Sequence, residues 1–198
     1  MLNVIQEILE AEAAAIRAIP TDNPFRECAE LFIATAKVGG KVVVIGVGKV
    51  GEIGKKIATT FCSVGVPSVF LHPLEAQHGD LGILHANDVM LLISNSGKTR
   101  EIVELASLAR RMHLLFRLVT LTGNRESLLV MMSDLVLWNG NPKEVCPLGL
   151  TPTTSTTTMA VIGDFLAVLI MRLSNYQAHE YALRHHSGYL GEKAKSTI

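Results

Sequence analysis

The sequence has no excess of either charge. Its 18 Lys and Arg residues are matched by 18 Asp and Glu residues, so the 198-residue chain has a formal net charge of zero. General nucleic-acid binders show a basic excess, and polybasic membrane anchors show a basic cluster, so the balance excludes both. Charged residues are also few, at 18%, against 48% hydrophobic residues. This composition excludes a disordered chain and predicts a well-buried core.

Cysteines and long apolar runs are scarce as well. The three cysteines, Cys28, Cys62 and Cys146, are widely spaced and form no C-x-x-C pair. That pattern indicates free thiols in a reducing cytosol and argues against a structural zinc site. The longest apolar stretch, 159–173, is interrupted by polar residues and is shorter than the ~20 residues that span a bilayer. The N-terminus is acidic, unlike a signal peptide, and we expect one cytoplasmic domain over residues 1–198.

Apolar residues recur at helical spacing in some segments and as short β-branched runs in others. We expect helices over 3–18, 25–36, 51–64, 99–113, 127–133, 154–173 and 177–190. We expect strands over 41–45, 66–71, 88–94, 115–120 and 134–138. Apolar strands that alternate with helices are typical of a parallel sheet covered on both faces. The prediction is an α/β fold in three layers, α/β/α, with a five-stranded parallel sheet of flavodoxin- or Rossmann-like type and extra helices at both ends.

In such folds ligands bind beyond the carboxyl ends of the strands. After the first strand, Gly46, Gly48 and Gly51 match the dinucleotide fingerprint G-x-G-x-x-G. The next strand, however, lacks the terminal acid that holds the ribose, since Glu75 comes only after a proline. A dinucleotide cofactor is therefore disfavoured, and we expect no cofactor. A tight turn that packs the helix on the strand is the simpler interpretation of these glycines.

Two helix starts are rich in hydroxyl groups. Ser94-Asn95-Ser96-Gly97-Lys98-Thr99 follows the third strand, and 153–158 contains only Thr and Ser. Exposed N–H groups and the helix dipole favour an anion at a helix start, and hydroxyl groups donate to phosphate oxygens. Ordinary capping is the alternative, but one cap needs only one such residue. We expect the two clusters to bind both ends of a sugar phosphate.

Ionisable side chains stand near these clusters: Glu75, His78, Asp80, Glu101, Glu144, His185 and His186. Each alone is more often a solvated or structural group. Beside phosphate-binding loops they suggest proton transfer on a sugar, with carboxylates and histidines as acid and base. No carboxylate or histidine spacing is convincing for a metal, and a zinc site built from His78 and His185 is the less favoured alternative.

Several motifs occur in a fixed order along the chain: GVGKVG (46–51), HPLEAQHGDLG (72–82), SNSG (94–97), EVCPLGLTPTTSTT (144–157) and YALRH (181–185). With them the chain, from about residue 5 to 192, resembles the sugar isomerase (SIS) domain of bacterial D-arabinose 5-phosphate isomerases. The resemblance implies interconversion of D-ribulose 5-phosphate and D-arabinose 5-phosphate for 3-deoxy-D-manno-octulosonate synthesis in lipopolysaccharide or capsule. It also implies an isomerase domain without the C-terminal CBS repeats that family members usually carry.

The same resemblance places the family's four ionisable active-site positions on Lys49, Glu101, Glu144 and His185. Our hypothesis gives the C–H proton to Glu144 or Glu101, ring opening or oxygen protonation to His185, and electrostatic stabilisation to Lys49. The expected substrate-binding residues lie in the glycine turn, after the second strand and in the two hydroxyl clusters. They are Gly46, Gly48, Glu75, His78, Ser94, Asn95, Ser96, Gly97, Thr99, Thr153, Thr154, Ser155 and Thr156.

The family pattern is not followed everywhere. Val50, Lys98-Thr99 and His186-Ser187 replace residues that the family commonly has, so the sugar phosphate and the turnover stay open. The alternatives are an isomerase for another sugar phosphate and a non-catalytic, phosphosugar-binding regulatory domain. The resemblance further implies a homo-oligomer, a dimer or a tetramer, with sites between subunits, and we expect the tetramer.

Overall fold

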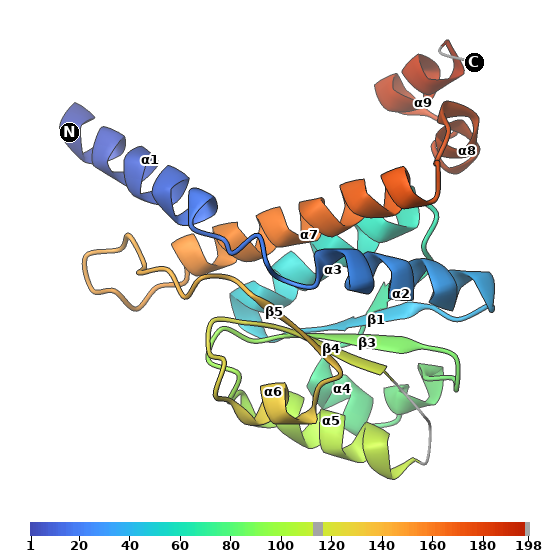
Figure 1. The fold of residues 1–198 in the computed structure, drawn as a ribbon, viewed down its shortest axis with the longest axis horizontal. Helices are drawn as coiled ribbons and strands as arrows, with labels where there is room; N and C mark the ends of the chain where they lie inside the picture. The colour runs from blue at the N-terminus through green and yellow to red at the C-terminus, as the bar shows by residue number, and fades with distance from the viewer. Residues whose placement is uncertain (113–116, 197–198) are drawn as a thin grey trace.

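A computed structural model describes residues 1–112 and 117–196, and five strands in it form one parallel sheet (Figure 1). The strands are β1 (Val42–Ile45), β2 (Ser68–Phe70), β3 (Val89–Ile93), β4 (Arg117–Thr122) and β5 (Leu135–Trp138). Their order is β2-β1-β3-β4-β5. In the register, Val42 pairs with Ser68 on one side and with Val89 on the other. This is the flavodoxin-like order of a doubly wound fold, which confirms the predicted class.

Helices cover both faces of the sheet. One face carries α2 (Phe25–Lys37), α3 (Gly48–Ser63) and α7 (Thr154–Leu173); the other carries α4 (Pro73–Gln77), the 3₁₀ helix η1 (Asp80–Ile83), α5 (Arg100–Arg111) and α6 (Leu128–Met132). The remaining helices are α1 (Leu2–Arg17), α8 (Ala178–Arg184) and α9 (Gly188–Lys195). Figure 1 shows α1 projecting from the layers and α8 and α9 beyond the C-terminal end of α7. The three-layer prediction is therefore confirmed.

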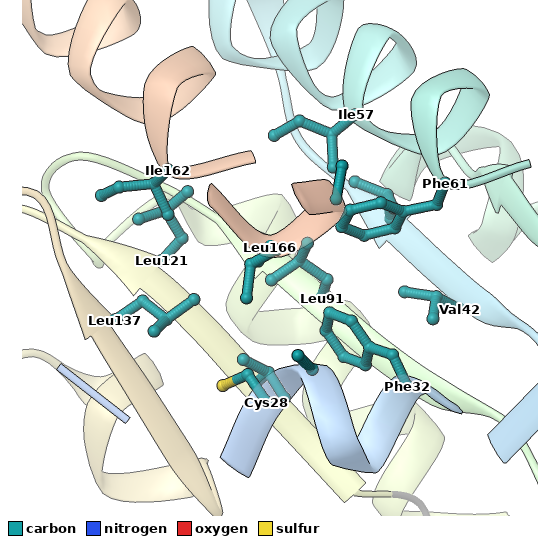
Figure 2. Close-up of a cluster of buried hydrophobic side chains, with 14 of the residues drawn as sticks. Cys28, Phe32, Val42, Ile57, Phe61, Leu91, Leu121, Leu137, Ile162 and Leu166 are labelled. Atoms are coloured by element: carbon teal, nitrogen blue, oxygen red, sulfur yellow. The ribbon is translucent and has the colours of Figure 1, made fainter. Parts of the chain in front are cut away.

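The alternation of side chains along each strand builds two separate cores. Val42 and Val44 face α2, α3 and α7, where Phe32 and Phe61 also pack (Figure 2). Val43 and Ile45, one residue along, face α4 and α5. Both sets are fully buried, which explains why the strands read as continuous β-branched runs in the sequence.

The topology also fixes where a ligand can bind. From β1 the chain enters α3 on one face of the sheet, whereas from the neighbouring β3 it enters α5 on the other face. The loops after these two strands therefore diverge and leave a crevice at the carboxyl edge, the topological switch point of such sheets. The loop from β5 to α7 approaches the same edge.

Some predicted boundaries were wrong. The helix expected over 177–190 is two helices, because the chain is extended at His185 and Ser187 and turns at Gly188, where φ is +79°. The helix after β1 begins at Gly48 and not at Gly51. Strand β4 continues to Thr122; its expected start and the expected helix end at 113 lie outside the described residues. The short helices α4 and η1 were not predicted.

Helix α7 is long and apolar enough, by length and composition alone, to cross a membrane. Its buried residues, which include Met159, Ile162 and Leu166, pack against the sheet and the neighbouring helices. Such packing is that of the core helix of a three-layer domain. Helix α1 is the opposite case, because none of its residues is buried and Val4, Ile5, Ile8 and Leu9 are all exposed.

Candidate active site at the carboxyl edge of the sheet

A cleft of about 700 Å³ opens at the carboxyl edge of the sheet. This volume lies in the range of small-molecule sites. Its walls come from the β5–α7 loop, the start of α3, the loop after β3 and the start of α7. The lining residues are Val50, Asn95, Asn141, Pro142, Lys143, Glu144, Cys146, Pro147, Leu148, Gly149, Leu150, Pro152 and Ser155. Among the predicted site residues, the cleft brings Asn95, Glu144 and Ser155 together.

Glu144 is held at the start of α7 by several donors. Its Oε2 accepts the N–H of Thr153 at 2.7 Å, the Oγ1 hydroxyl of Thr153 at 2.9 Å and the N–H of Ser155 at 3.3 Å. Its Oε1 accepts the hydroxyl of Ser155. The carboxylate thus takes the place that a bound anion would take at this helix start, where N–H groups and the dipole favour negative charge.

These contacts decide the protonation of Glu144. Partial burial acts to raise its pKa, but the hydrogen bonds from the side chain of Ser155 and from Thr153 outweigh burial, so the pKa of Glu144 lies below its ordinary value. Donors that bind the ionised form stabilise it over the neutral acid. The cleft therefore contains a carboxylate that is ionised at neutral pH.

The hydroxyl groups at the start of α7 that were predicted to bind a phosphate, those of Thr153, Thr154, Ser155 and Thr156, all donate within the chain in this structure. Their contact with a sugar phosphate stays a prediction. Thr153 and Ser155 donate to Glu144, and the Thr154 hydroxyl donates to Oε1 of Glu12 at 2.9 Å. The Thr156 hydroxyl donates to the carbonyl of Thr153. A hydroxyl group has one proton to donate, and here the chain itself uses each of them.

The start of α5 is arranged differently. The Ser94 hydroxyl accepts the N–H of Gly97 and shares a proton with Oγ1 of Thr99 at 2.7 Å, while Ser96 accepts the N–H of Lys98. These contacts shape the turn. Within 1–112 and 117–196, no acceptor bonds the N–H groups of residues 99–101, and no carboxylate caps this helix. The start of α5 therefore remains able to receive an anion.

Gly97 is needed in this turn for two reasons. Its φ is +61°, in the left-handed region, and a Cβ at this position would overlap the side chain of Ser127. Only glycine meets both conditions without strain. Gly97 therefore shapes this loop, and its predicted contact with the substrate stays a prediction.

Asn139 and Asn141, which follow β5, lie beside the predicted Asn95 but were not themselves predicted as site residues. Asn95 and Asn141 line the cleft, and the fully buried Asn139 donates to Oδ1 of Asn95 at 3.0 Å. A Cβ on Gly123 would lie 2.6 Å from Oδ1 of Asn95 and 3.1 Å from the same atom of Asn139. Asn139 and Asn95 are 44 residues apart in the chain, so no local pattern marks their contact.

The glycine turn after β1 is a packing feature. A Cβ on Gly46 would lie 3.1 Å from the backbone of Gly51, so the two glycines let the strand and helix approach closely. Gly48 has φ +60° and is the first residue of α3. Lys49 follows it and is exposed, while Val50 lines the cleft. The Lys49 side chain thus starts from the rim of the cleft.

The other predicted ionisable groups do not line the cleft of one chain. Glu101 is half-buried in the first turn of α5, and Glu75 and His78 are exposed in and just after α4. His185 follows α8, and its ring stacks on the ring of Tyr181 with the ring centroids 3.8 Å apart. Its Nδ1 lies 3.1 Å from the Tyr181 carbonyl oxygen. Of the four catalytic positions, only Glu144 is in the cleft.

His185 is separated from Glu144 by the length of α7. Glu144 is bonded to the first turn of this 20-residue helix, and α8 follows its last turn. A helix of this length spans about 30 Å. His78 directly follows α4 and His185 directly follows α8, and Figure 1 shows these two helices on opposite sides of the sheet. One chain therefore does not form the zinc site considered from the sequence, and the described residues contain no group of three metal ligands.

Cys146 is a further feature of the cleft. Its Sγ accepts the N–H groups of Thr151 at 3.1 Å and Leu150 at 3.2 Å. The hydrogen bond from Thr151 is the main reason that the pKa of Cys146 is lowered. Cys28 contrasts with it, because burial and the charge of Glu27 raise the pKa of that thiol to about 12. All three cysteines are free, as predicted.

Comparisons with known proteins agree with this architecture. The sequence profile of the SIS domain matches residues 36–169. A crystal structure from Bacteroides fragilis, provisionally named a phosphosugar isomerase involved in capsule formation, is 53% identical; the match covers 96% of this chain and 99% of that one, with a TM-score of 0.93. A protein of Escherichia coli CFT073, solved in complex with arabinose 5-phosphate, is 36% identical over 93% of this chain and 96% of its own, with a TM-score of 0.83.

Curated relatives are longer than this chain. The arabinose 5-phosphate isomerase KdsD of Salmonella typhi is 46% identical over 166 residues, which is 84% of this chain and 49% of that protein. The chain thus spans about half the length of the curated relatives it matches.

Proposed function

Because the chain belongs to the SIS domain family, we propose that it is an aldose–ketose isomerase that interconverts D-ribulose 5-phosphate and D-arabinose 5-phosphate. The observation that carries this proposal is the ionised Glu144 carboxylate in a cleft that also contains Asn95, next to the open start of α5. One end of the site offers a base and the other end offers donors for a phosphate. The names of the relatives support this substrate, and the pathway to 3-deoxy-D-manno-octulosonate is part of the proposal.

The substrate would bind with its phosphate at the start of α5 and its carbonyl end toward Glu144. Main-chain N–H groups of residues 99–101 and the hydroxyl groups of Ser94, Ser96 and Thr99 surround the phosphate position. Phosphate is stabilised there by the helix dipole as well as by these donors. Asn95 lines the cleft and belongs to the loop that leads into α5.

Isomerisation moves a proton between C1 and C2 through an enediol. We assign this proton to Glu144, because it lies in the cleft and is ionised at neutral pH, whereas Glu101 is outside the cleft. A positioned acid–base group of this kind contributes roughly 10²–10⁴ in rate. The hydrogen-bond donors around Glu144 lower its basicity, but they also keep the carboxylate ionised at neutral pH. Lys49, from the rim, would stabilise negative charge on the sugar oxygens.

The acid for ring opening, His185, would come from a second copy of the chain. Within one chain it is a helix length away from Glu144, so a shared site between subunits satisfies the chemistry. Helix α1 presents an apolar face for such an assembly, with Ile5 and Leu9 more than half exposed. We propose a cytoplasmic homo-oligomer, with a tetramer as the expected size.

The deciding experiment is an isomerase assay of the purified protein against a panel of five- to seven-carbon sugar phosphates, with its mass measured in solution. We expect turnover of D-arabinose 5-phosphate and loss of activity on dilution to monomers. Turnover of a six- or seven-carbon member alone would change the substrate. Binding of the panel without any turnover would contradict the isomerase and favour a regulatory binding domain.

A further inference from the structure

Asn139 follows β5 and is fully buried, and both ends of its amide are bonded. Its Oδ1 accepts the main-chain N–H of Asn141 at 2.9 Å, and its Nδ2 donates to Oδ1 of Asn95 at 3.0 Å. A main-chain N–H can only donate, so the atom that faces it must be the Asn139 oxygen. The Asn139 nitrogen therefore necessarily points at Asn95.

This orientation is passed on to Asn95. An amide nitrogen can only donate, so Asn95 must present its oxygen to Asn139 and direct its NH₂ group elsewhere. Asn95 lines the cleft, and its Nδ2 donates to no residue within 1–112 or 117–196. The unbonded polar end of Asn95 is thus a hydrogen-bond donor.

Neighbouring backbone makes room for this pair of amides. Gly123 lies next to the side-chain oxygens of both asparagines. A Cβ at this position would come within 2.6 Å of Oδ1 of Asn95, so only a glycine leaves room for the pair. The N–H of Asn141, which fixes the chain of bonds, turns back onto the side chain of Asn139 across Gly140, whose φ is +88°, and Asn141 itself has a left-handed φ of +49°. Asparagine tolerates this conformation better than most residues.

We propose that Asn139 is a positioning residue that makes the wall of the cleft a donor at Asn95, so that the site selects a negatively charged oxygen there. This inference rests on the proposed function, because it takes the cleft to be the sugar-phosphate site. The oxygen belongs either to the phosphate or to the sugar as its carbonyl becomes an enediolate. Either oxygen would accept a hydrogen bond from the NH₂ group of Asn95.

The test is Asn139→Asp. An aspartate at position 139 still accepts the N–H of Asn141 with one oxygen. Its other oxygen replaces the NH₂ group that now donates to Asn95. Asn95 must then turn its own NH₂ group toward position 139, which leaves its oxygen facing the cleft. If the oxygen belongs to the phosphate, we expect KM for D-arabinose 5-phosphate and Kd for inorganic phosphate to rise together, about ten- to a hundredfold, with kcat changed much less, because a hydrogen bond to a charged group is lost. If the oxygen belongs to the enediolate, we expect kcat to fall by a similar factor with Kd for phosphate unchanged, because that charge exists only after the proton has left carbon.

The matched control is Asn23→Asp. Asn23 also bonds the end of β5, accepting the N–H of Trp138 at 2.8 Å and donating to its carbonyl at 2.9 Å, but it lies outside the cleft. We expect it to lower the melting temperature and to leave KM unchanged. A folded Asn139→Asp variant with the KM and the kcat of the unsubstituted protein would overturn the inference.

A second measurement needs no substitution and stands if Asn139→Asp does not fold. In NMR spectra of the unsubstituted protein, the side-chain NH₂ signals of Asn95 should shift when D-arabinose 5-phosphate is added. Unmoved Asn95 signals at saturation would overturn the positioning role. A protein that neither binds nor converts any sugar phosphate would instead overturn the proposed function, and the role of Asn139 with it.

Discussion

At the start of α7, Glu144 accepts from Thr153 and Ser155 and fills the position of an anion; at the start of α5, no carboxylate of the described chain does so. Both helix starts are rich in serine and threonine, and both lie at the carboxyl edge of one sheet. The same residue types thus bind a fixed carboxylate at the start of α7 and leave the start of α5 open to an anion from solution.

The difference shows that hydroxyl content does not by itself define a phosphate site. What decides is whether the chain supplies its own anion, because the N–H groups and the dipole of a helix start can stabilise one such charge. Glu144 comes from a loop that returns to α7, whereas the loop before α5 carries Lys98 and no acid. Under the proposed function, two helix starts that look equivalent in the sequence would therefore serve as a base position and a binding position.

The largest effect is expected from Glu144→Gln. Glutamine retains an oxygen for Thr153 and Ser155 but carries no charge and cannot accept the proton from carbon. We expect kcat for D-arabinose 5-phosphate to fall by roughly 10²–10⁴, the contribution of a positioned acid–base group, with KM little changed. Glu7→Gln, on the exposed side of α1, is the control. Near-full activity of Glu144→Gln in steady-state kinetics would show that the start of α7 is not the base position.

The next effect concerns the start of α5. Gly97→Ala should displace this turn, because the new Cβ would overlap Ser127, and we expect KM to rise about tenfold or more as hydrogen bonds to the phosphate are lost. Gly39→Ala is the control, since Gly39 also has a positive φ, of +78°, but no atom lies within 4 Å of its Cβ position. Equal KM values in the two variants would place the phosphate elsewhere.

The smallest effect is a pH dependence of stability. The pKa of Glu144 is lowered in the folded protein, so its stabilising contribution is present above its ordinary value of 4.5 and is lost as pH falls through the lowered pKa. Ser155→Ala should cost about 1 kcal/mol of unfolding free energy at pH 7, and this difference should shrink in acid. Urea unfolding between pH 3 and 7 measures it.

The control for this prediction is Thr157→Ala. The Thr157 hydroxyl donates to the main-chain carbonyl of Thr153 and not to a carboxylate. The loss of this hydroxyl should therefore lower the free energy of unfolding by about the same amount as Ser155→Ala at pH 7, or by less, and this cost should not change with pH. If the Ser155→Ala difference were equally independent of pH, the fixed anion at the start of α7 would not be Glu144.

Much of the fold could be predicted because it depends on local patterns. The β-branched run at 42–45 and the helical spacing in α7 each appear within one segment, and apolar strands between helices suffice for a three-layer sheet. The break at His185–Ser187 was missed because the apolar residues Tyr189 and Leu190 resume seven residues after Ala182 and Leu183, a spacing that one continuous helix would also show. Short elements such as α4 carry too few residues for a periodicity to show.

The sequence by itself determined the layers, the edge of the sheet where polar residues gather, and Glu144 and Asn95 as candidate members of the site. Only the tertiary structure decided that Glu144 takes the donors at the start of α7, that His185 lies a helix length away, and that Asn139 orients Asn95. The physical reason is that hydrogen-bond partners are chosen by proximity in space: Asn139 and Asn95 are 44 residues apart in the chain, and no local pattern records that they meet.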